Sequence, residues 1–470
     1  MTAGVRFSGE ALSRQAAGRT GASWRITVDF TAQRLVFRAG DEGYEEEIAG
    51  FQTGFAQRPE IVFGASSADD VVAAVSYAAD AGLPVGVQAT GHGLPGDAEG
   101  GVLISTRRMD SVRVDAAART VTVGAGVRWG RVVEAAAEHG LAPLNGSAPS
   151  VGAVSYTLGG GLGVLAREFG YAADHVRWLD VVTADGALRH VTPETEPELF
   201  WGLLGGGANL GVVTALEIGL VPVARLYGGA IEFDGREVDP AAVLRAYEAW
   251  TRTVPDGLTS SVAALVYPDM PQLPPHLRGR YLVTVRVAYT GSEAAGERLV
   301  APLRELGPAV SDSLREMPYT DSHTIHSDPD FPHSYYGDSV VVRELDVAAA
   351  CELFALTGPA AETMHVVQIN QLGGALAKPA GNAVPYRDAG WLVRVLSPLD
   401  GTDVDAVRAV QARAFGLFAG EGRLLNFAFG AGDRTDGLYD AGTRKRLAEL
   451  KVTYDPANLF RRNYGVGTTG

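Results

Sequence analysis

The segment Leu83–Gly93, LPVGVQATGHG, is the most informative stretch of this chain, because an apolar run leads directly into a histidine between two glycines. Two more glycine-rich turns follow it, GGGLG at Gly159–Gly163 and GGGANLG at Gly205–Gly211. Glycine lets backbone N–H groups approach phosphate oxygens closely, because it has no Cβ and tolerates positive φ. The three turns together suggest a large phosphate-bearing cofactor with the side chain of His92 fixed against it.

The composition is that of a folded protein with a full hydrophobic core. The 470 residues suffice for two or three domains, and 46% hydrophobic with 20% charged residues excludes general disorder. The net charge of -15 comes from 40 Lys and Arg against 55 Asp and Glu, and no basic run interrupts the acidic excess. Nucleic acids and anionic membrane surfaces are therefore not expected as partners.

The cysteine content and the hydropathy of the chain indicate whether disulfides can form and in which compartment the protein is expected. The single cysteine, Cys351, allows no intrachain disulfide, and its helical apolar context, Val347–Phe354, indicates a packing role. The N-terminus has no apolar targeting segment, and no apolar stretch approaches the roughly 20 residues that span a bilayer. We therefore expect a cytoplasmic protein.

The first half of the chain has an α+β pattern. We interpret residues 1–50 as an N-terminal extension with one alternating segment at Trp24–Phe30, and 51–222 as the first domain. In that domain Ser67 has the position of a helix N-cap, with a carboxylate three residues later. Asp185-Gly186 lies between two short strand-like runs and predicts a hairpin.

The second half has a different pattern, and we assign residues 223–424 to a second domain. Its long alternating runs are separated by helical segments, which favours an antiparallel sheet with helices on one face. These runs are Ser261–Tyr267, Tyr281–Tyr289, Met364–Ile369 and Trp391–Leu396. Residues 425–470 are expected to return to the first domain. The predicted fold class is therefore α+β.

The sequence does not favour a Rossmann dinucleotide site or a metal site. A Rossmann dinucleotide site is not favoured, because the first strand-turn-helix unit carries no GxGxxG. The loop 317–338 contains side chains that could bind a metal ion, but we interpret it as a polar loop facing a substrate and predict no metal site. Those side chains are Asp321, His323, His326, Asp328 and His333.

The ordered motifs resemble the FAD-linked oxidases of the vanillyl-alcohol-oxidase type (the PCMH-type FAD-binding superfamily), specifically the berberine-bridge-enzyme-like group. The resemblance covers roughly residues 50–222 and 364–465. The motifs that carry it are Arg58-Pro59, Gly91-His92, Met109-Asp110, Val112–Asp115, Gly124–Gly126, Gly146–Gly152, Gly159–Gly161, Arg167–Gly170, Thr183–Gly186, Leu199–Gly202, Gly205–Val213 and Lys451–Asn463.

This resemblance implies an FAD-binding domain of two α+β subdomains and a substrate domain above the flavin. It also implies a covalent bond from His92 to the 8α-methyl carbon of FAD. Many relatives add a cysteinyl bond at the position of Ala148, which cannot form a thioether, so we expect a single link. The residues expected to contact FAD are Thr90, Gly91, His92, Gly93, Gly96, Pro149, Ser150, Val151, Gly152, Gly160, Gly161, Gly163, Gly206, Gly207, Asn209, Gly211, Val212 and Asn463.

The chain departs from the family pattern at the position of the expected catalytic base. Many relatives use a tyrosine in a YxN segment, but the matching position here is Leu424 in Leu424–Phe427. Gln88 stands where relatives often have arginine. Either of two tyrosines could act as a base, and three amides could orient a substrate without deprotonating it. The candidates are Tyr386 and Tyr336 for the base, and Asn370, Gln371 and Asn426 for orientation.

The resemblance implies an FAD-dependent oxidase of a small organic alcohol, amine or hydroquinone, in bacterial secondary metabolism and with O2 as electron acceptor. Without the tyrosine base, substrates that need no strong base become more plausible. A dehydrogenase with another acceptor, and a flavin-containing non-redox cyclase or binding protein, remain alternatives. The sequence leaves the substrate and the oligomeric state open.

Overall fold

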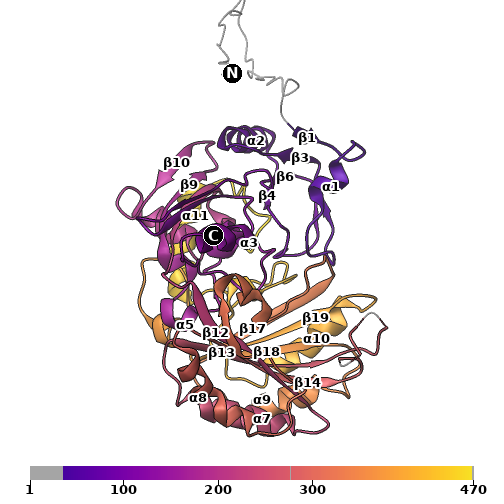
Figure 1. Cartoon of the computed structure of the whole chain (residues 1–470). Helices are drawn as coiled ribbons and strands as arrows, with labels where there is room; N and C mark the ends of the chain where they lie inside the picture. The colour runs from indigo at the N-terminus through magenta and orange to yellow at the C-terminus, as the bar shows by residue number, and fades with distance from the viewer. Residues whose placement is uncertain (1–34, 272, 276, 468–470) are drawn as a thin grey trace, which may run out of the picture. The chain divides into compact units, whose positions relative to one another are not determined.

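The computed structural model describes residues 35–271, 273–275 and 277–467, so the predicted strand-like segment Trp24–Phe30 lies outside the described residues. The described part contains three main sheets, and Figure 1 shows their arrangement. A further short parallel pair joins β2 (Gln57–Arg58) to β5 (Ala98–Glu99).

The first sheet has four strands in the order β1-β3-β6-β4. Strands β3, β6 and β4 are parallel, and β1 is antiparallel to β3. Residues assigned to the N-terminal extension thus form β1 and helix α1, because the apolar side chains of both pack on this sheet. The elements are β1 (Leu35–Phe37), α1 (Tyr44–Ile48), β3 (Ile61–Gly64), α2 (Ala68–Ala81), β4 (Val85–Gln88) and β6 (Val102–Ser105).

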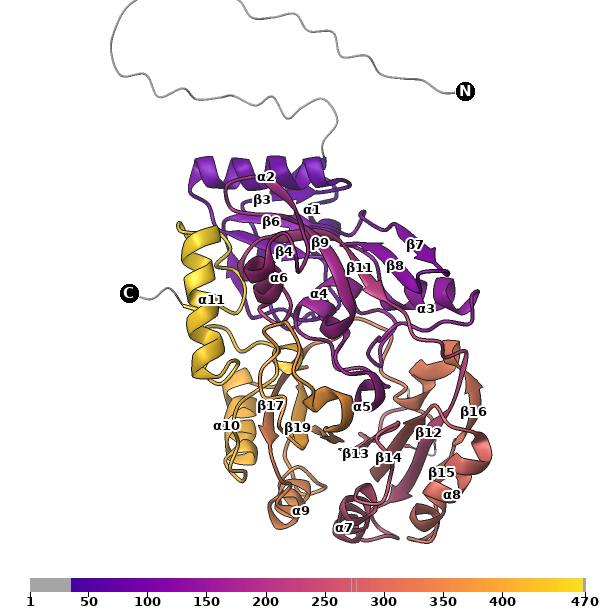
Figure 2. The ribbon, with the colours of Figure 1, turned by 90° about the vertical axis from the view of Figure 1, so that its left-hand side faces the viewer.

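Helix α2 covers this sheet, as Figure 2 shows. The Ser67 hydroxyl accepts a hydrogen bond from the backbone N–H of Asp70, whose carboxylate accepts one from the backbone of Ser67. The predicted capping box is therefore confirmed. Gly82 ends the helix in the left-handed conformation, with φ 65°, and the chain turns into β4 toward His92.

The second sheet has five antiparallel strands in the order β10-β9-β11-β8-β7. The predicted hairpin at Asp185-Gly186 is confirmed, because it joins β9 to β10 and Gly186 has φ 75°. The strands and the helices interspersed with them are β7 (Val112–Asp115), β8 (Thr120–Gly124), α3 (Trp129–Ala137), α4 (Ala153–Leu158), α5 (Ala166–Phe169), β9 (Val176–Val182), β10 (Leu188–Val191), α6 (Pro197–Leu203) and β11 (Val212–Gly219).

The third sheet has eight strands and is antiparallel, as the alternating runs predicted. Its order is β15-β12-β14-β13-β18-β19-β17, and β16 also pairs with β12. The strands are β12 (Arg225–Asp234), β13 (Leu258–Val266), β14 (Tyr281–Tyr289), β15 (Ser311–Asp312), β16 (Arg315–Pro318), β17 (Tyr335–Val342), β18 (Val366–Gln371) and β19 (Trp391–Pro398).

One face of this eight-stranded sheet is buried under four helices. On β14, Val283, Val285 and Val287 belong to one apolar core with side chains of all four helices. Successive side chains of a strand point to opposite faces, so Arg286 and its alternate neighbours point away from these helices. Figure 1 shows α7, α8 and α9 below the strands. The helices are α7 (Pro240–Thr251), α8 (Glu293–Arg304), α9 (Val347–Leu356) and α10 (Val404–Phe415).

The C-terminal segment packs on the first part of the chain. Helix α11 (Ala441–Tyr454) contacts α6, and the backbone N–H of Val85 in β4 donates to the Leu459 carbonyl at 2.8 Å. These contacts agree with the expected return, while the domain boundaries stay a prediction. None of the described helices is long and apolar enough to cross a membrane.

A buried ion pair holds this segment in place. The Lys451 ammonium donates to Asp455 Oδ2 at 2.6 Å, to the Asn209 carbonyl at 2.8 Å and to the Phe460 carbonyl at 3.2 Å. Asp455 in turn accepts from the backbone N–H groups of Leu459 and Phe460. Burial lowers the pKa of Lys451, and the Asp455 carboxylate opposes that shift. The network thus links the C-terminal segment to the third glycine turn.

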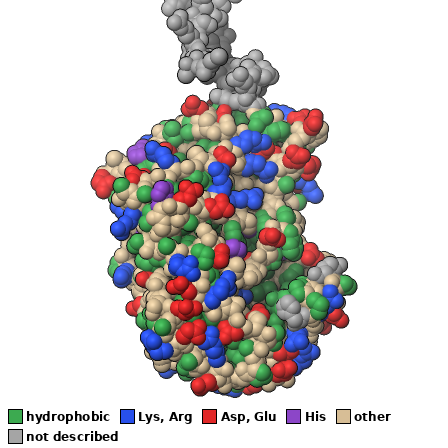
Figure 3. Space-filling model, viewed as in Figure 1, with side chains coloured by type: hydrophobic (Ala, Val, Ile, Leu, Met, Phe, Trp, Pro, Cys, Tyr) green, Lys and Arg blue, Asp and Glu red, His purple; other side chains and the backbone are tan. Residues whose placement is uncertain are grey.

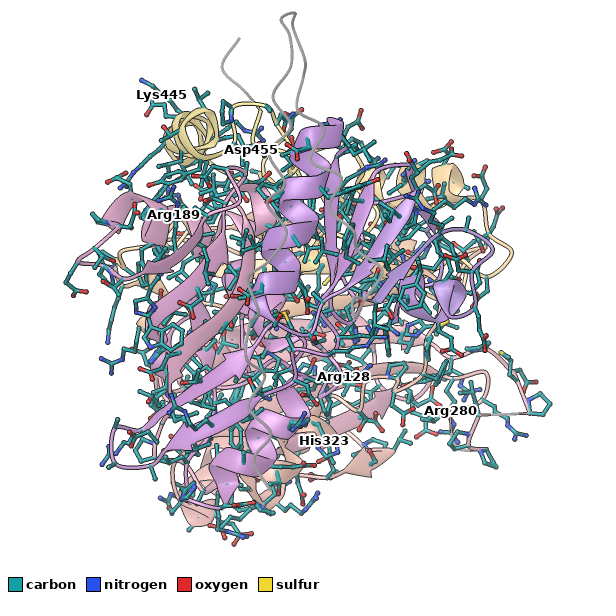
Figure 4. All side chains as sticks on the ribbon, turned by 90° about the horizontal axis from the view of Figure 1, so that it is seen from above. Arg128, Arg189, Arg280, His323, Lys445 and Asp455 are labelled. Atoms are coloured by element: carbon teal, nitrogen blue, oxygen red, sulfur yellow. The ribbon has the colours of Figure 1, made fainter. Side chains whose placement is uncertain are left out.

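We predict that Lys451→Met lowers the free energy of unfolding by about 3–5 kcal/mol, because Asp455 would remain buried without its counter-charge. Lys445→Met is the control, since Lys445 is exposed on the same helix and points outward in Figure 4. Urea unfolding of both variants measures the difference. Equal stability of the two variants would contradict the importance of the network.

Candidate active site

A cavity of about 980 Å³ lies between the three glycine turns and the helix-free face of the eight-stranded sheet. Its walls combine backbone of the turns with side chains of β13, β14, β18 and β19. Figure 3 shows a hollow with hydrophobic side chains on its walls on this face of the molecule. The cavity has two chemically different sides, one rich in glycine and one where strands present polar side chains among apolar ones.

The turn that carries His92 is packed against the segment just before β2. Gly91 has φ +69°, and a Cβ there would lie 2.6 Å from Cα of Gly50, so position 91 needs glycine. The His92 ring stacks on Phe51, with 3.8 Å between centroids and 14° between planes. The Tyr335 hydroxyl donates to the His92 carbonyl at 2.7 Å. The stack thus holds the imidazole, and the Tyr335 hydrogen bond holds its backbone.

The His92 side chain is neutral and has one unused nitrogen. Burial lowers its pKa to about 4, and the positive charge of Arg128 adds to this shift, while the backbone of Ser150 opposes it. Its Nε2 is buried and has no hydrogen-bond partner among the described residues. A fixed, neutral imidazole with a free nitrogen on a cavity wall is suited to nucleophilic attack on a bound group.

The second turn is held by an asparagine from the far end of the chain. The backbone N–H of Gly161 donates to Asn426 Oδ1 at 2.8 Å, and Asn426 Nδ2 donates to the Tyr156 carbonyl at 3.0 Å. A Cβ on Gly161, which has φ +78°, would lie 2.6 Å from the Tyr156 ring. The turn therefore needs glycine for close packing, and Gly163 reaches the cavity.

The third turn is bound by the C-terminal segment. Asn209 Nδ2 donates to the Tyr464 carbonyl at 2.9 Å, and Asn463 Nδ2 donates to the Ala208 carbonyl at 2.9 Å. A Cβ on Gly206 would lie 2.2 Å from the Gly202 carbonyl oxygen, so this glycine serves helix packing. The turn and the C-terminal segment form one wall of the cavity.

The residues expected to contact a cofactor divide into two groups. Half line the cavity: Thr90, Gly91, His92, Gly93, Val151, Gly163, Gly207, Asn209 and Asn463. The others are absent from its lining, and several glycines among them serve close backbone packing, as at Gly211, where a Cβ would lie 2.6 Å from Val181. This second group is Gly96, Pro149, Ser150, Gly152, Gly160, Gly161, Gly206, Gly211 and Val212.

The two candidate tyrosines lie outside the cavity lining. The Tyr336 hydroxyl accepts from Arg434 Nη2 at 3.0 Å, and the Tyr386 hydroxyl donates to the Gly437 carbonyl at 2.9 Å. Burial raises the pKa of both phenols. Strand alternation explains why Tyr336 lies outside the lining, because Tyr335 faces the cavity from β17 and Tyr336 points to the opposite side of the strand. The structure therefore places neither tyrosine to act as a base.

The three candidate amides have different environments. Asn370 lines the cavity, and its buried Oδ1 has no partner among the described residues. Gln371, the next residue of β18, faces the helices and donates to the Thr251 carbonyl at 3.0 Å. Asn426 lines the cavity but uses both ends of its amide in the second glycine turn. Only Asn370 of these three offers an unused polar atom to a ligand.

Sequence reasoning missed the polar side chains on the sheet side of the cavity. Ser261, Arg286, Gln368 and Arg394 line it, each from within a strand of the eight-stranded sheet. A single arginine inside a run such as YLVTVRVAY was the available signal. Of the loop that faces the cavity, His326, Asp328 and His333 contribute to the lining. Among the described residues, no three His, Cys, Asp or Glu side chains come together as metal ligands do.

Comparison with known proteins shows that the chain is similar to FAD-binding oxidases. Residues 59–192 match the model of an FAD binding domain. The chain is 29% identical to (R)-6-hydroxynicotine oxidase of Paenarthrobacter nicotinovorans over 95% of this chain and 100% of that protein. The chain is an FAD-dependent oxidoreductase, and it is similar to FAD-linked oxidases. The resemblance inferred from the motifs is confirmed.

Other relatives agree with this family. An FAD-linked oxidoreductase of Dictyostelium discoideum is 25% identical over 92% of this chain and 94% of its own length. The crystal structure of 6-hydroxy-D-nicotine oxidase from Arthrobacter nicotinovorans has a TM-score of 0.81 at 26% identity, covering 94% of this chain and 100% of that one. A Physcomitrella patens BBE-like protein shares the fold, with a TM-score of 0.78 at 17% identity, covering 92% of this chain and 97% of that one.

The residues present fit an FAD molecule. The glycine side of the cavity exposes backbone without Cβ atoms, which suits a pyrophosphate, and the free nitrogen of His92 lies on the same side. Gly93 shows the fit most directly, because it lines the cavity and a Cβ there would meet no protein atom within 4 Å.

We predict that Gly93→Leu leaves the stability of the flavin-free protein within about 0.5 kcal/mol of wild type but strongly lowers its flavin content. The added side chain would project into the cavity and occupy cofactor space. Gly381→Leu is the matched control, because a Cβ at that exposed glycine also meets nothing within 4 Å. Thermal unfolding and visible absorbance of the purified proteins measure both effects. Normal flavin content in Gly93→Leu would contradict this placement of the cofactor.

Proposed function

We propose that this protein is an oxidase with FAD attached through His92 alone, acting on a small organic alcohol, amine or hydroquinone in bacterial secondary metabolism. Molecular oxygen is the proposed electron acceptor. The single observation that carries the proposal is the neutral, unpartnered His92 imidazole on the glycine side of a cavity whose other side bears polar side chains.

The surroundings of His92 support a histidyl link. The stack on Phe51 and the Tyr335 hydrogen bond hold the ring and its backbone, so little motion is needed for bond formation. At neutral pH the imidazole needs no deprotonation, because its pKa is about 4. Ala148 lines the cavity without a nucleophilic atom, and Cys351 lies on α9 on the helix side of the sheet. These positions favour a single covalent bond.

The sheet side of the cavity supports binding and orientation of a small substrate. Bound FAD supplies the capacity to accept a hydride from a substrate C–H bond. Asn370 offers a free acceptor, and Gln368 a free donor, for orienting that bond. His326 is a weak base, since burial and the charge of Arg286 lower its pKa. A cavity that orients without a strong base favours substrates that lose hydride readily.

The names of the relatives agree with this range of substrates. They include an oxidase of 6-hydroxynicotine and structural neighbours that are chitooligosaccharide and xylooligosaccharide oxidases. The first name denotes an amine and the other two denote sugars, which carry hydroxyl groups. These names support the amine and alcohol donors of the proposal.

We predict that acid-precipitated wild-type protein keeps yellow flavin and that His92→Ala releases it. His333→Ala is the control, because His333 also lines the cavity and is close to Phe51, but its ring is tilted by 74° to that side chain. Fluorescence of the denatured protein in a gel measures the covalent flavin. Retention of flavin by His92→Ala, or its loss from the control alone, would assign the link elsewhere.

We expect at least one amine, secondary alcohol or hydroquinone in a small panel to give hydrogen peroxide in step with oxygen uptake. Bleaching of the flavin under anaerobic conditions without oxygen turnover would identify a dehydrogenase instead. Neither bleaching nor peroxide with any donor class would favour the cyclase or binding-protein alternative.

A further inference from the structure

The sheet side of the cavity carries a row of polar side chains across three adjacent strands. Arg286 of β14 is in register with Ser261 of β13, and Ser261 is in register with Asn370 of β18. All three line the cavity. Residues directly opposite one another in a sheet share a face, and strands are about 4.8 Å apart, so a small molecule can reach across the whole row.

Each member of this row has a buried polar atom without a partner among the described residues. These atoms are Nε and Nη1 of Arg286, Oγ of Ser261 and Oδ1 of Asn370. Ser261 is only 2% exposed. Buried polar groups in native proteins are normally hydrogen-bonded, and exceptions call for an explanation such as a ligand. The row can therefore bind a molecule that offers hydrogen-bond acceptors to Arg286 and a hydrogen-bond donor to Asn370.

The neighbouring row contains an arginine, Arg394, whose guanidinium group has protein partners. Arg394 of β19 is in register with Gln368 of β18, and Arg394 Nη2 donates to Gln368 Oε1 at 2.6 Å. Its guanidinium also lies over the Phe427 ring, 4.8 Å from the centroid. Gln368 is 3% exposed, and its Nε2 remains free on the cavity side. Arg394 is thus held by protein groups, whereas Nε and Nη1 of Arg286 have no partner among the described residues.

The charges around Arg286 leave room for an anion. The carboxylate of Asp328 acts on both Arg286 and Arg394 electrostatically, but no ion pair within 4 Å joins it to either among the residues described. The Ser147 hydroxyl donates to Asp328 instead. Glu232 of the neighbouring β12 acts on Arg286 only weakly and accepts from Ser311 at 2.7 Å. Around Arg286, two guanidinium groups therefore share the carboxylate of Asp328, while the lining elsewhere carries Asp338, Asp400 and Arg462.

We propose that the substrate of this oxidoreductase carries a carboxylate, which Arg286 and the Ser261 hydroxyl bind, and a hydrogen-bond donor that Asn370 Oδ1 accepts. Arginine binds carboxylates through several N–H donors with defined geometry, and the charge-assisted bonds are stronger than neutral ones. The proposal deepens the proposed function, on which it rests, by naming a substrate class. It also explains why an arginine occurs within the apolar run of β14.

The test uses the flavin-containing protein and two probes of nearly equal shape, benzoate and its neutral counterpart benzamide. Isothermal titration calorimetry measures both, so the result does not depend on turnover. We expect benzoate to bind at least about tenfold more tightly than benzamide. Arg286→Met should abolish that preference, and Arg286→Lys should keep part of it, because charge remains but the planar fork is lost. Arg298→Met, an exposed arginine of α8 on the helix side, should leave it unchanged.

A second readout separates ligand binding from structural support. Removing an unpaired buried charge is expected to leave the melting temperature of Arg286→Met equal to or above that of wild type. Equal binding of benzoate and benzamide by wild type would overturn the proposal, as would a benzoate preference that survives in Arg286→Met. A lower melting temperature together with an unchanged preference would show a structural role for Arg286 and overturn it as well.

Failure of the proposed oxidase function has a different signature. In that case no donor produces peroxide, although benzoate still binds in preference to benzamide and the preference still depends on Arg286. Loss of the carboxylate preference with intact peroxide formation would leave the oxidase proposal standing and remove the substrate class alone.

Discussion

The alternation of side chains in the eight-stranded sheet is the constraint on which the site depends. Each strand must send one set of side chains into the core under α7 to α10, and this leaves the other set to face the glycine turns. Apolar residues such as Val285 occupy the first set, and Arg286 the second. The sheet can therefore bury a large apolar area on one side and still present polar groups to a ligand on the other.

The glycine turns form the opposite wall, and their glycines serve two physical purposes. Some, such as Gly161 and Gly206, are needed because a Cβ would collide with neighbouring protein atoms. Others, such as Gly93, border open cavity and leave space that a cofactor can occupy. Asn426 and the C-terminal Lys451 network hold these turns from parts of the chain far away in sequence. This wall of the cavity is thus assembled from segments far apart in the chain.

The sequence predicted the elements with strong local signals and failed where a side chain's direction mattered. The helix capped by Ser67, the hairpin at Asp185-Gly186 and the antiparallel sheet were all recoverable, because capping, turn chemistry and alternation are local properties. These local signals did not predict which of the catalytic candidates reach the cavity. Tyr336 lies one residue from the cavity-facing Tyr335, and a shift of one position in a strand reverses the face.

The sequence by itself determined the α+β fold class, because alternation, capping and turn residues are local signals. Its ordered motifs also carried the resemblance that implied FAD. Only the tertiary structure decided which of these residues reach the cavity. It also revealed that Arg286, Ser261 and Asn370 form one row with unpaired polar atoms. The physical reason is that strand register joins residues far apart in the chain, and the side chains that share a face become known only once the register is known.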